Sequence, residues 1–172
     1  MGDIGRDVAR KLRVFDMKII YYNRRQLAPE LEKELEAEYI PTLQELLKRC
    51  DVLSINCPLT PETHHLISGP EFALMKHGSY LVNTARGPVI DEPALKEALI
   101  SGKIKRAGLD VFENEPDIDP FFRTCEQVTI QPHYGGFSIG TIRKGEQLVL
   151  NNIRSFLETG KPLTAVNADQ LN

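Results

Sequence analysis

Short apolar runs with the composition of β-strands alternate with helical periodicity along almost all of this 172-residue chain. The strand-like runs cover residues 17–23, 51–56, 79–83, 106–111 and 127–133. Helix-start residues or apolar side chains at helical spacing predict helices over 4–15, 29–38, 43–50, 70–75, 92–102 and 141–157. Strands that alternate with helices at such short intervals indicate an α/β fold with a doubly wound parallel sheet.

The composition is that of an ordinary globular protein, with 41% hydrophobic and 26% charged residues. A net charge of −3 gives no electrostatic reason to expect nucleic acid or a membrane as a partner. The three cysteines, Cys50, Cys57 and Cys125, form no C-x-x-C pair, which argues against a disulfide framework and against a zinc site. The sequence has no signal-peptide pattern, so we expect a soluble, cytoplasmic protein. We also expect no metal site.

A glycine pair opens the first predicted helix. Gly2-Asp3-Ile4-Gly5 matches the last two glycines of the dinucleotide-binding pattern G-x-G-x-x-G. Glycines let the backbone approach a pyrophosphate, and a helix amino terminus favours its negative charge. We therefore expect Gly2, Asp3, Ile4 and Gly5 to contact a dinucleotide cofactor. The alternative is an ordinary helix that happens to begin with glycine.

The strand after that helix ends in Asn23-Arg24-Arg25, about where the pattern places its ribose-binding residue. An acidic residue there selects NAD by accepting hydrogen bonds from the ribose 2′-hydroxyl. A neutral Asn with two arginines suits a 2′-phosphate through forked, charge-assisted hydrogen bonds. The residues therefore favour NADP over NAD, and the alternative is ordinary surface charge.

Polar residues stand at the ends of the predicted strands, where ligands of open α/β sheets bind. They are Asn23, Asn56, Arg86, Asp110 and His133. Taken singly, Arg86, Glu115 and His133 each have a common structural explanation as a salt bridge, a turn acid and a loop histidine. Their order along the chain, each within a distinctive segment, makes chance a poor explanation.

Four segments carry a family resemblance: "CPLTPETHHLI", "NTARGPVIDEPAL", "GLDVFENEP" and "QPHYGG". In this order they resemble the D-isomer-specific 2-hydroxyacid dehydrogenases, which include glyoxylate/hydroxypyruvate reductases and phosphoglycerate dehydrogenase. The likeness covers essentially the whole chain. "HYGGFSIGT" and "NNIRSFLETGKPLTAVN" look closest to the fungal D-mandelate dehydrogenase-like branch.

The resemblance implies a role for individual residues. Arg86 matches the arginine that binds the substrate carboxylate and keto oxygen, and it also borders the cofactor. His133 matches the catalytic acid/base, which likewise borders the cofactor, and Glu115 matches its carboxylate partner. Asp110 matches the residue that holds the nicotinamide carboxamide. Further positions on cofactor-lining segments are Cys57, Pro58, Thr84, Ala85 and Gly135.

Reduction of a 2-keto acid requires these residue types on chemical grounds as well. A guanidinium can fix and polarise the substrate through a bidentate contact. A histidine can give the forming alkoxide its proton near neutral pH, and an adjacent carboxylate stabilises the imidazolium. We interpret Cys57 as a small residue of the cofactor wall rather than a nucleophile. His64 and His65 are taken to flank a strand-to-helix connection, and Phe121-Phe122 to serve packing or a subunit contact.

The glycine pair is preceded by neither the first glycine of the pattern nor a strand. We therefore expect residues 1–140 to be a dinucleotide-binding domain that lacks its first strand. The resemblance implies that 141–172, a helix and tail, would pack on an absent substrate domain. It also implies a homodimer that uses a small 2-keto or 2-hydroxy acid.

The fragment is expected to be a weak enzyme or inactive alone. The alternatives are a nucleotide-regulated binding module of corepressor type and a non-catalytic remnant.

Overall fold

The computed structural model describes residues 1–168, which belong to two compact units divided between His133 and Tyr134. The division falls seven residues before the expected boundary after residue 140. In the first unit the elements follow one another as α1 (Asp3–Arg13), β1 (Ile19–Tyr21), α2 (Pro29–Leu35), β2 (Ala37–Tyr39), α3 (Leu43–Arg49), β3 (Val52–Ile55), α4 (Gly69–Leu74), β4 (Ser79–Asn83), η1 (Gly87–Val89), α5 (Glu92–Ile100), β5 (Ile104–Leu109), α6 (Pro120–Thr124) and β6 (Val128–Ile130).

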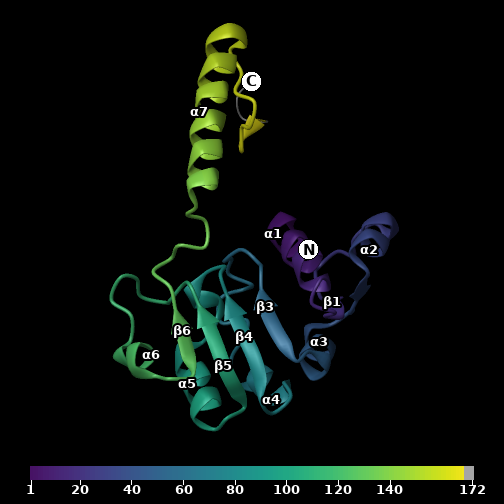
Figure 1. Ribbon diagram of the computed structural model, residues 1–172, viewed down its shortest axis with the longest axis vertical. Helices are drawn as coiled ribbons and strands as arrows, with labels where there is room; N and C mark the ends of the chain where they lie inside the picture. Colours follow the sequence, from purple (N-terminus) through teal and green to yellow (C-terminus); the bar gives the residue numbers. More distant parts are fainter. Residues whose placement is uncertain (169–172) are drawn as a thin grey trace. The chain divides into compact units, whose positions relative to one another are not determined.

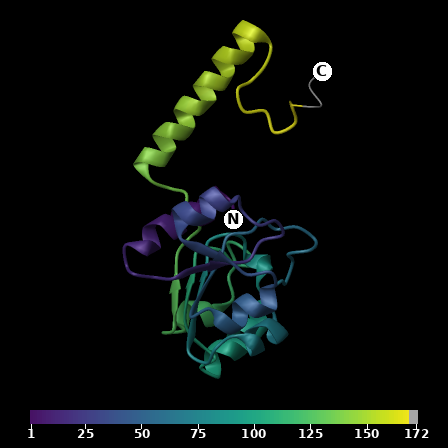
Figure 2. The same ribbon diagram turned by 90° about the vertical axis from the view of Figure 1, so that its right-hand side faces the viewer.

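Four parallel strands form the main sheet, in the order β3-β4-β5-β6 (Figure 1). Side chains on these strands alternate between buried and more exposed positions, so one face of the sheet is better covered than the other. Helices α3, α4 and α5 lie along the covered face (Figure 2). Leu47, Phe72 and Leu99 of these helices pack with Leu81 and Leu109 of the strands in the main core.

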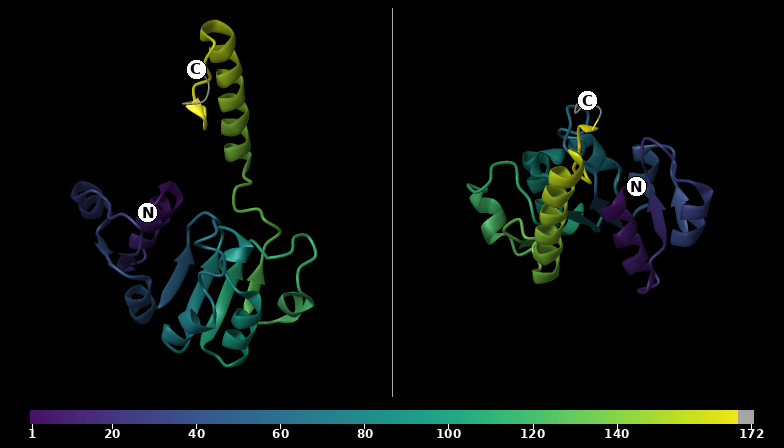
Figure 3. Two further views of the ribbon diagram at one scale, coloured as in Figure 1. Left: turned by 180° about the vertical axis from the view of Figure 1, so that it is seen from behind. Right: turned by 90° about the horizontal axis from the view of Figure 1, so that it is seen from above.

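The strands β1 and β2 form a separate, two-stranded parallel sheet. Its small core consists of Ala9, Tyr21, Leu35 and Ala37, and α1 and α2 lie beside it (Figure 3). The Tyr21 hydroxyl donates to Glu32 Oε1 at 2.6 Å. Burial and this carboxylate together raise the pKa of Tyr21 to about 12, so the phenol is a neutral donor.

The expectation of a parallel α/β fold is confirmed, but the strands divide into two sheets. The chain also leaves the predicted helix 29–38 early, because Glu36 adopts a left-handed backbone with φ of 48°. This turn allows the unexpected strand β2 to begin at Ala37. The short helix α6 was unexpected too; within it Phe122 is buried, so that residue has a packing role.

The second unit contains α7 (Ile139–Thr159), which agrees with the helix predicted over 141–157. Ser138 Oγ accepts from the Thr141 amide at 3.1 Å and caps its start. Gly160 ends it in a left-handed conformation with φ of 73°. Asn152 exchanges hydrogen bonds with Thr164, which ties the following segment to the helix. Within residues 1–168, no helix is both long and apolar enough to cross a membrane.

Candidate active site

The four parallel strands of the main sheet end at one edge, and the candidate residues follow directly from those ends (Figure 1). Asn56 follows β3, Thr84 follows β4 and Asp110 follows β5. His133 comes three residues after the end of β6. The topology therefore brings together four positions that are up to 77 residues apart in the sequence (133 minus 56).

Asn83, the last residue of β4, organises the turn that carries Arg86. Its side chain is buried; Nδ2 donates to the Arg86 carbonyl at 3.0 Å and Oδ1 accepts from the Ala85 amide at 3.0 Å. Its carbonyl accepts from the Asp110 amide at 3.0 Å. Sequence reasoning treated Asn83 only as part of a strand. A polar residue at the end of a buried strand is nevertheless a sign that its side chain forms hydrogen bonds with the turn that follows.

Glu115 and His133 form a hydrogen-bonded pair, with His133 Nδ1 2.7 Å from Glu115 Oε2. The other carboxylate oxygen accepts from the Phe112 amide at 2.8 Å. His133 has a left-handed backbone with φ of 59°, which is uncommon for a residue with a side chain. The structure thus joins the two residues that the resemblance implies as a catalytic pair.

The pKa of the Glu115 carboxyl lies below its usual value. Burial alone would raise it, but hydrogen bonds from His133 and the Phe112 amide, together with the charges of His133 and Arg86, outweigh this effect. Glu115 is therefore an anion at neutral pH. The exposed Arg86 side chain, which donates to the Ala85 carbonyl at 2.6 Å, is near enough to contribute to this pKa.

The amino terminus of α1 lies beside the end of β3. A Cβ atom on Gly5 would fall 2.8 Å from Met1 Cγ and 3.7 Å from Asn56 Cβ, so the glycine permits a close approach. Gly2 is the N-cap residue, and no side chain caps this helix start. Asp3 points to solvent and pairs with Arg6. A helix amino terminus that begins after a glycine and has no side-chain cap fits the pyrophosphate of a dinucleotide.

The segment after β1 holds Asn23, Arg24 and Arg25 together. Asn23 Nδ2 donates to the Arg25 carbonyl at 3.0 Å, and the Asn23 carbonyl accepts from the Tyr39 hydroxyl at 3.3 Å. Both arginine side chains are exposed. Among residues 1–168, neither guanidinium has a hydrogen bond or ion pair, although the charge of Arg24 contributes to the lowered pKa of the Glu62 carboxyl.

Cys57 packs against the main core, and burial raises the pKa of its thiol. A neutral thiol is a weak nucleophile, which agrees with a role as a wall residue. The neighbouring Pro58 carbonyl accepts from Thr63 Oγ1 at 2.7 Å. Gly135 belongs to the second unit, so its contact with a cofactor stays a prediction.

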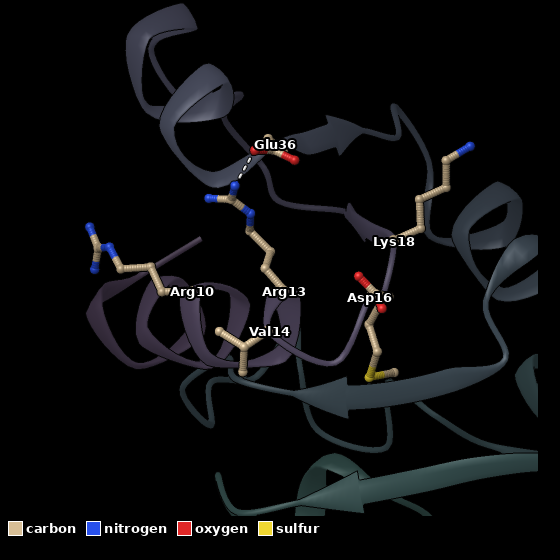
Figure 4. Close-up of a pocket in the computed structure, with 7 residues that line it drawn as sticks. Arg10, Arg13, Val14, Asp16, Lys18 and Glu36 are labelled. Atoms are coloured by element: carbon tan, nitrogen blue, oxygen red, sulfur yellow. Dashed lines mark hydrogen bonds and ion pairs between the residues drawn. The ribbon is translucent and has the colours of Figure 1, made fainter.

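A cavity of about 550 Å³ lies elsewhere, between the end of α1 and the start of β1 (Figure 4). Its two arginines already have acidic partners: Arg13 pairs with Glu36, and Arg10 with Asp7 and Glu34. Because both guanidinium charges are neutralised in this way, this cavity is a poor candidate for the phosphate site. The lining residues are Arg10, Arg13, Val14, Asp16, Met17, Lys18 and Glu36.

Comparisons with known proteins identify the family of the chain. The family model described as "D-isomer specific 2-hydroxyacid dehydrogenase, NAD binding domain" matches residues 1–135. A protein named dehydrogenase efuE from Hormonema carpetanum is 53% identical over 97% of this chain and 42% of its own length. A glyoxylate reductase structure from Paecilomyes thermophila has a TM-score of 0.91 at 48% identity, covering 98% of this chain and 51% of the other.

The holo D-mandelate dehydrogenase of Rhodotorula graminis has a TM-score of 0.87 at 44% identity, over 90% of this chain and 45% of that one. This chain thus spans about half the length of the relatives it matches. Their names are those of dehydrogenases and reductases, and nothing in them supports a corepressor-type module. Since the family model spans most of the chain and the relatives align along nearly all of it, the chain belongs to the D-isomer-specific 2-hydroxyacid dehydrogenase family.

Proposed function

We propose that this chain supplies the cofactor-binding and acid/base part of an NAD(P)H-dependent enzyme that interconverts small 2-keto acids and D-2-hydroxy acids. The observation that carries the proposal is the Glu115–His133 pair, 2.7 Å apart, near Arg86. Hydride transfer to a keto acid needs a proton donor beside a group that binds an anion. Both are present here.

His133 would act as the acid in reduction and the base in oxidation. Glu115 holds Nδ1, which leaves Nε2 to give its proton to the keto oxygen as that oxygen becomes an alkoxide. The anionic Glu115 orients the ring and complements the positive charge that the ring carries whenever it is protonated. The Arg86 guanidinium would bind the substrate carboxylate and polarise the keto group. When bound, the nicotinamide supplies or accepts the hydride.

The cofactor would lie along the edge at which the strands of the main sheet end. The uncapped start of α1 would hold the pyrophosphate, and Asp110 the nicotinamide carboxamide. Arg24 and Arg25 would bind a ribose 2′-phosphate, so we propose NADPH as the preferred cofactor. Their exposed guanidinium groups support this choice.

The domain contacts, the assembly and the location of the whole protein are also proposals. We infer that residues 141–172 pack on a substrate domain, that the enzyme is a homodimer and that it acts in the cytoplasm. The share of the relatives that this chain covers, about half, supports a two-domain enzyme.

The test follows NADPH and NADH oxidation by the protein isolated from its native source. Glyoxylate, hydroxypyruvate and phenylglyoxylate are the keto acids. We expect turnover with NADPH exceeding that with NADH, and His133→Asn to lower kcat by roughly 10²–10⁴-fold. His77→Asn, at a histidine remote from these residues in the sequence, is the matched control. No oxidation with any of the acids, or an unimpaired His133→Asn enzyme, would contradict the proposal.

A further inference from the structure

Two histidines and a glutamate that the proposed reaction does not use come together in the first unit. His64 and His65 lie in the segment between β3 and α4, and Glu113 lies in the loop after β5. One possible ligand atom from each side chain lies within 4.8 Å of the other two. His65 Nε2 contacts Glu113 Oε1, and the two imidazole rings lie with their centroids 4.0 Å apart and their planes tilted by 31°.

The turn η1 (Gly87–Val89) fixes the backbone on both sides of this cluster. The His65 amide donates to the Pro88 carbonyl at 2.8 Å. A Cβ atom on Gly87 would fall 1.9 Å from the Phe112 carbonyl carbon and 2.5 Å from the Glu113 nitrogen, so the two peptides are in direct contact. The relative positions of His65 and Glu113 are therefore set by the backbone.

The segment that carries His64 is also held in place. Its amide donates to the Thr60 carbonyl at 3.0 Å. Thr63 Oγ1 accepts from the Thr60 amide at 2.8 Å and donates to the Pro58 carbonyl at 2.7 Å. The cluster is thus supported by two turns rather than lying on a loose loop.

The surroundings favour a cation. His64 is exposed, whereas His65 and Glu113 are half-buried, so an ion can enter from solvent and still be partly shielded. Glu113 also lines a cavity of about 330 Å³ together with three acidic residues and a single lysine. The acidic residues are Glu92, Asp117 and Asp119. A wall with this excess of carboxylates raises the local concentration of cations.

We propose that His64, His65 and Glu113 form a binding site for a divalent transition metal, with Zn²⁺ the best match. Two imidazole nitrogens and one carboxylate oxygen are a common zinc donor set, with water in the fourth position. Mg²⁺ and Ca²⁺ prefer oxygen ligands throughout. Tetrahedral zinc places its ligand atoms about 3.3 Å apart at bond lengths of roughly 2.0 Å. The side chains would therefore close around the ion while the direct His65–Glu113 contact opens.

No metal site is expected from the sequence, and the proposal departs from that expectation. The spacing of the cysteines says nothing about this site, because the proposed ligands are two histidines and a glutamate that lies 48 residues from His65. Glu113 is also distinct from Glu115, which the structure pairs with His133.

The experiment is calorimetric titration of untagged, chelator-treated protein with Zn²⁺, with Co²⁺ as a spectroscopic probe. We expect one ion per chain with a Kd in roughly the micromolar range. Bound Co²⁺ should show the visible bands of tetrahedral nitrogen and oxygen coordination. His64→Ala and Glu113→Gln should each weaken binding at least about tenfold.

His77→Ala is the matched control, because His77 lies outside the cluster and should be replaceable without effect on affinity. Far-ultraviolet circular dichroism of each variant separates loss of the site from loss of the fold. The proposal is overturned if binding is absent in the wild type, or if His64→Ala and Glu113→Gln bind Zn²⁺ as well as the wild type. It is also overturned if His133→Ala alone abolishes binding, since the ion would then occupy the Glu115–His133 pair.

Discussion

Individual residues of the candidate active site owe their properties to contacts between distant parts of the chain. Glu115 shows this most clearly. One carboxylate oxygen forms a hydrogen bond with His133 Nδ1, and the other accepts a hydrogen bond from the Phe112 amide. The two bonds orient the carboxylate and the imidazole together. They also explain why its pKa is lowered although burial acts in the opposite direction.

This lowered pKa predicts how stability depends on pH. A carboxyl whose folded pKa lies below its unfolded value near 4.5 stabilises the fold above that value. The contribution is lost as the pH falls through the folded pKa. Glu115→Gln should therefore lower Tm at pH 6–7 by the equivalent of at most about 1 kcal/mol, since the pair is partly exposed. The difference from wild type should vanish in acid.

Thermal unfolding across this pH range measures the effect, with Glu126→Gln as the control. Glu126 is exposed and its side chain has no ion-pair partner in the described part of the chain, so this variant should follow the wild type. A Glu115→Gln deficit that stays constant down to pH 2–3 would contradict the assignment of the lowered pKa.

Sequence alone identifies Arg86, Glu115 and His133 as candidates because each stands in a distinctive local segment. It does not identify Asn83, whose role depends on two hydrogen bonds to the turn that follows β4. Nor does it reveal the His65–Glu113 contact, because only the fold brings these segments together. The type of a residue indicates which chemistry its side chain can perform, whereas its hydrogen-bond partners depend on the tertiary structure.

At the scale of elements, the loop after β5 is held against η1 by close backbone packing. Gly87 makes this possible because it lacks a Cβ atom. The same loop carries Glu113 and Glu115 and therefore supports both the proposed metal site and the candidate active site. For both sites, the position of this loop matters more than whether the loop forms regular secondary structure.

Gly87→Ala should destabilise the protein by about 1–3 kcal/mol or more, because the new methyl group would overlap the Phe112 carbonyl. The matched control is Gly69→Ala at the start of α4, where a Cβ atom meets nothing within 4 Å. That variant should change stability by less than about 1 kcal/mol. Urea unfolding midpoints compare the two, and equal midpoints would contradict the packing argument.

Helix starts were predictable where a local hydrogen bond defines them. Thr42 caps α3 and Asp91 caps α5 through side-chain contacts to backbone amides three residues later. Strand β2 was not predictable, because its three residues form a strand only by pairing with β1. The left-handed Glu36 that precedes it has no local sequence signal comparable to glycine.

At the scale of the whole molecule, the order β3-β4-β5-β6 explains why four distant segments meet at one edge. Parallel strands place all their carboxyl ends together, so each following loop contributes one side chain to a shared site. Membership of the D-isomer-specific 2-hydroxyacid dehydrogenase family agrees with this arrangement. The sequence could predict the parallel α/β class from its alternating elements, but the division into two sheets depends on which strands pair.

The most direct test of the central claim, that this edge binds a dinucleotide, is an NMR titration of ¹⁵N-labelled chain with NADPH. We predict saturable shifts of amide signals that cluster at Ile4, Thr84 and Asp110, which lie at the start of α1 and after β4 and β5. Absence of saturable shifts, or shifts confined to the cavity lined by Arg10 and Arg13, would contradict the account.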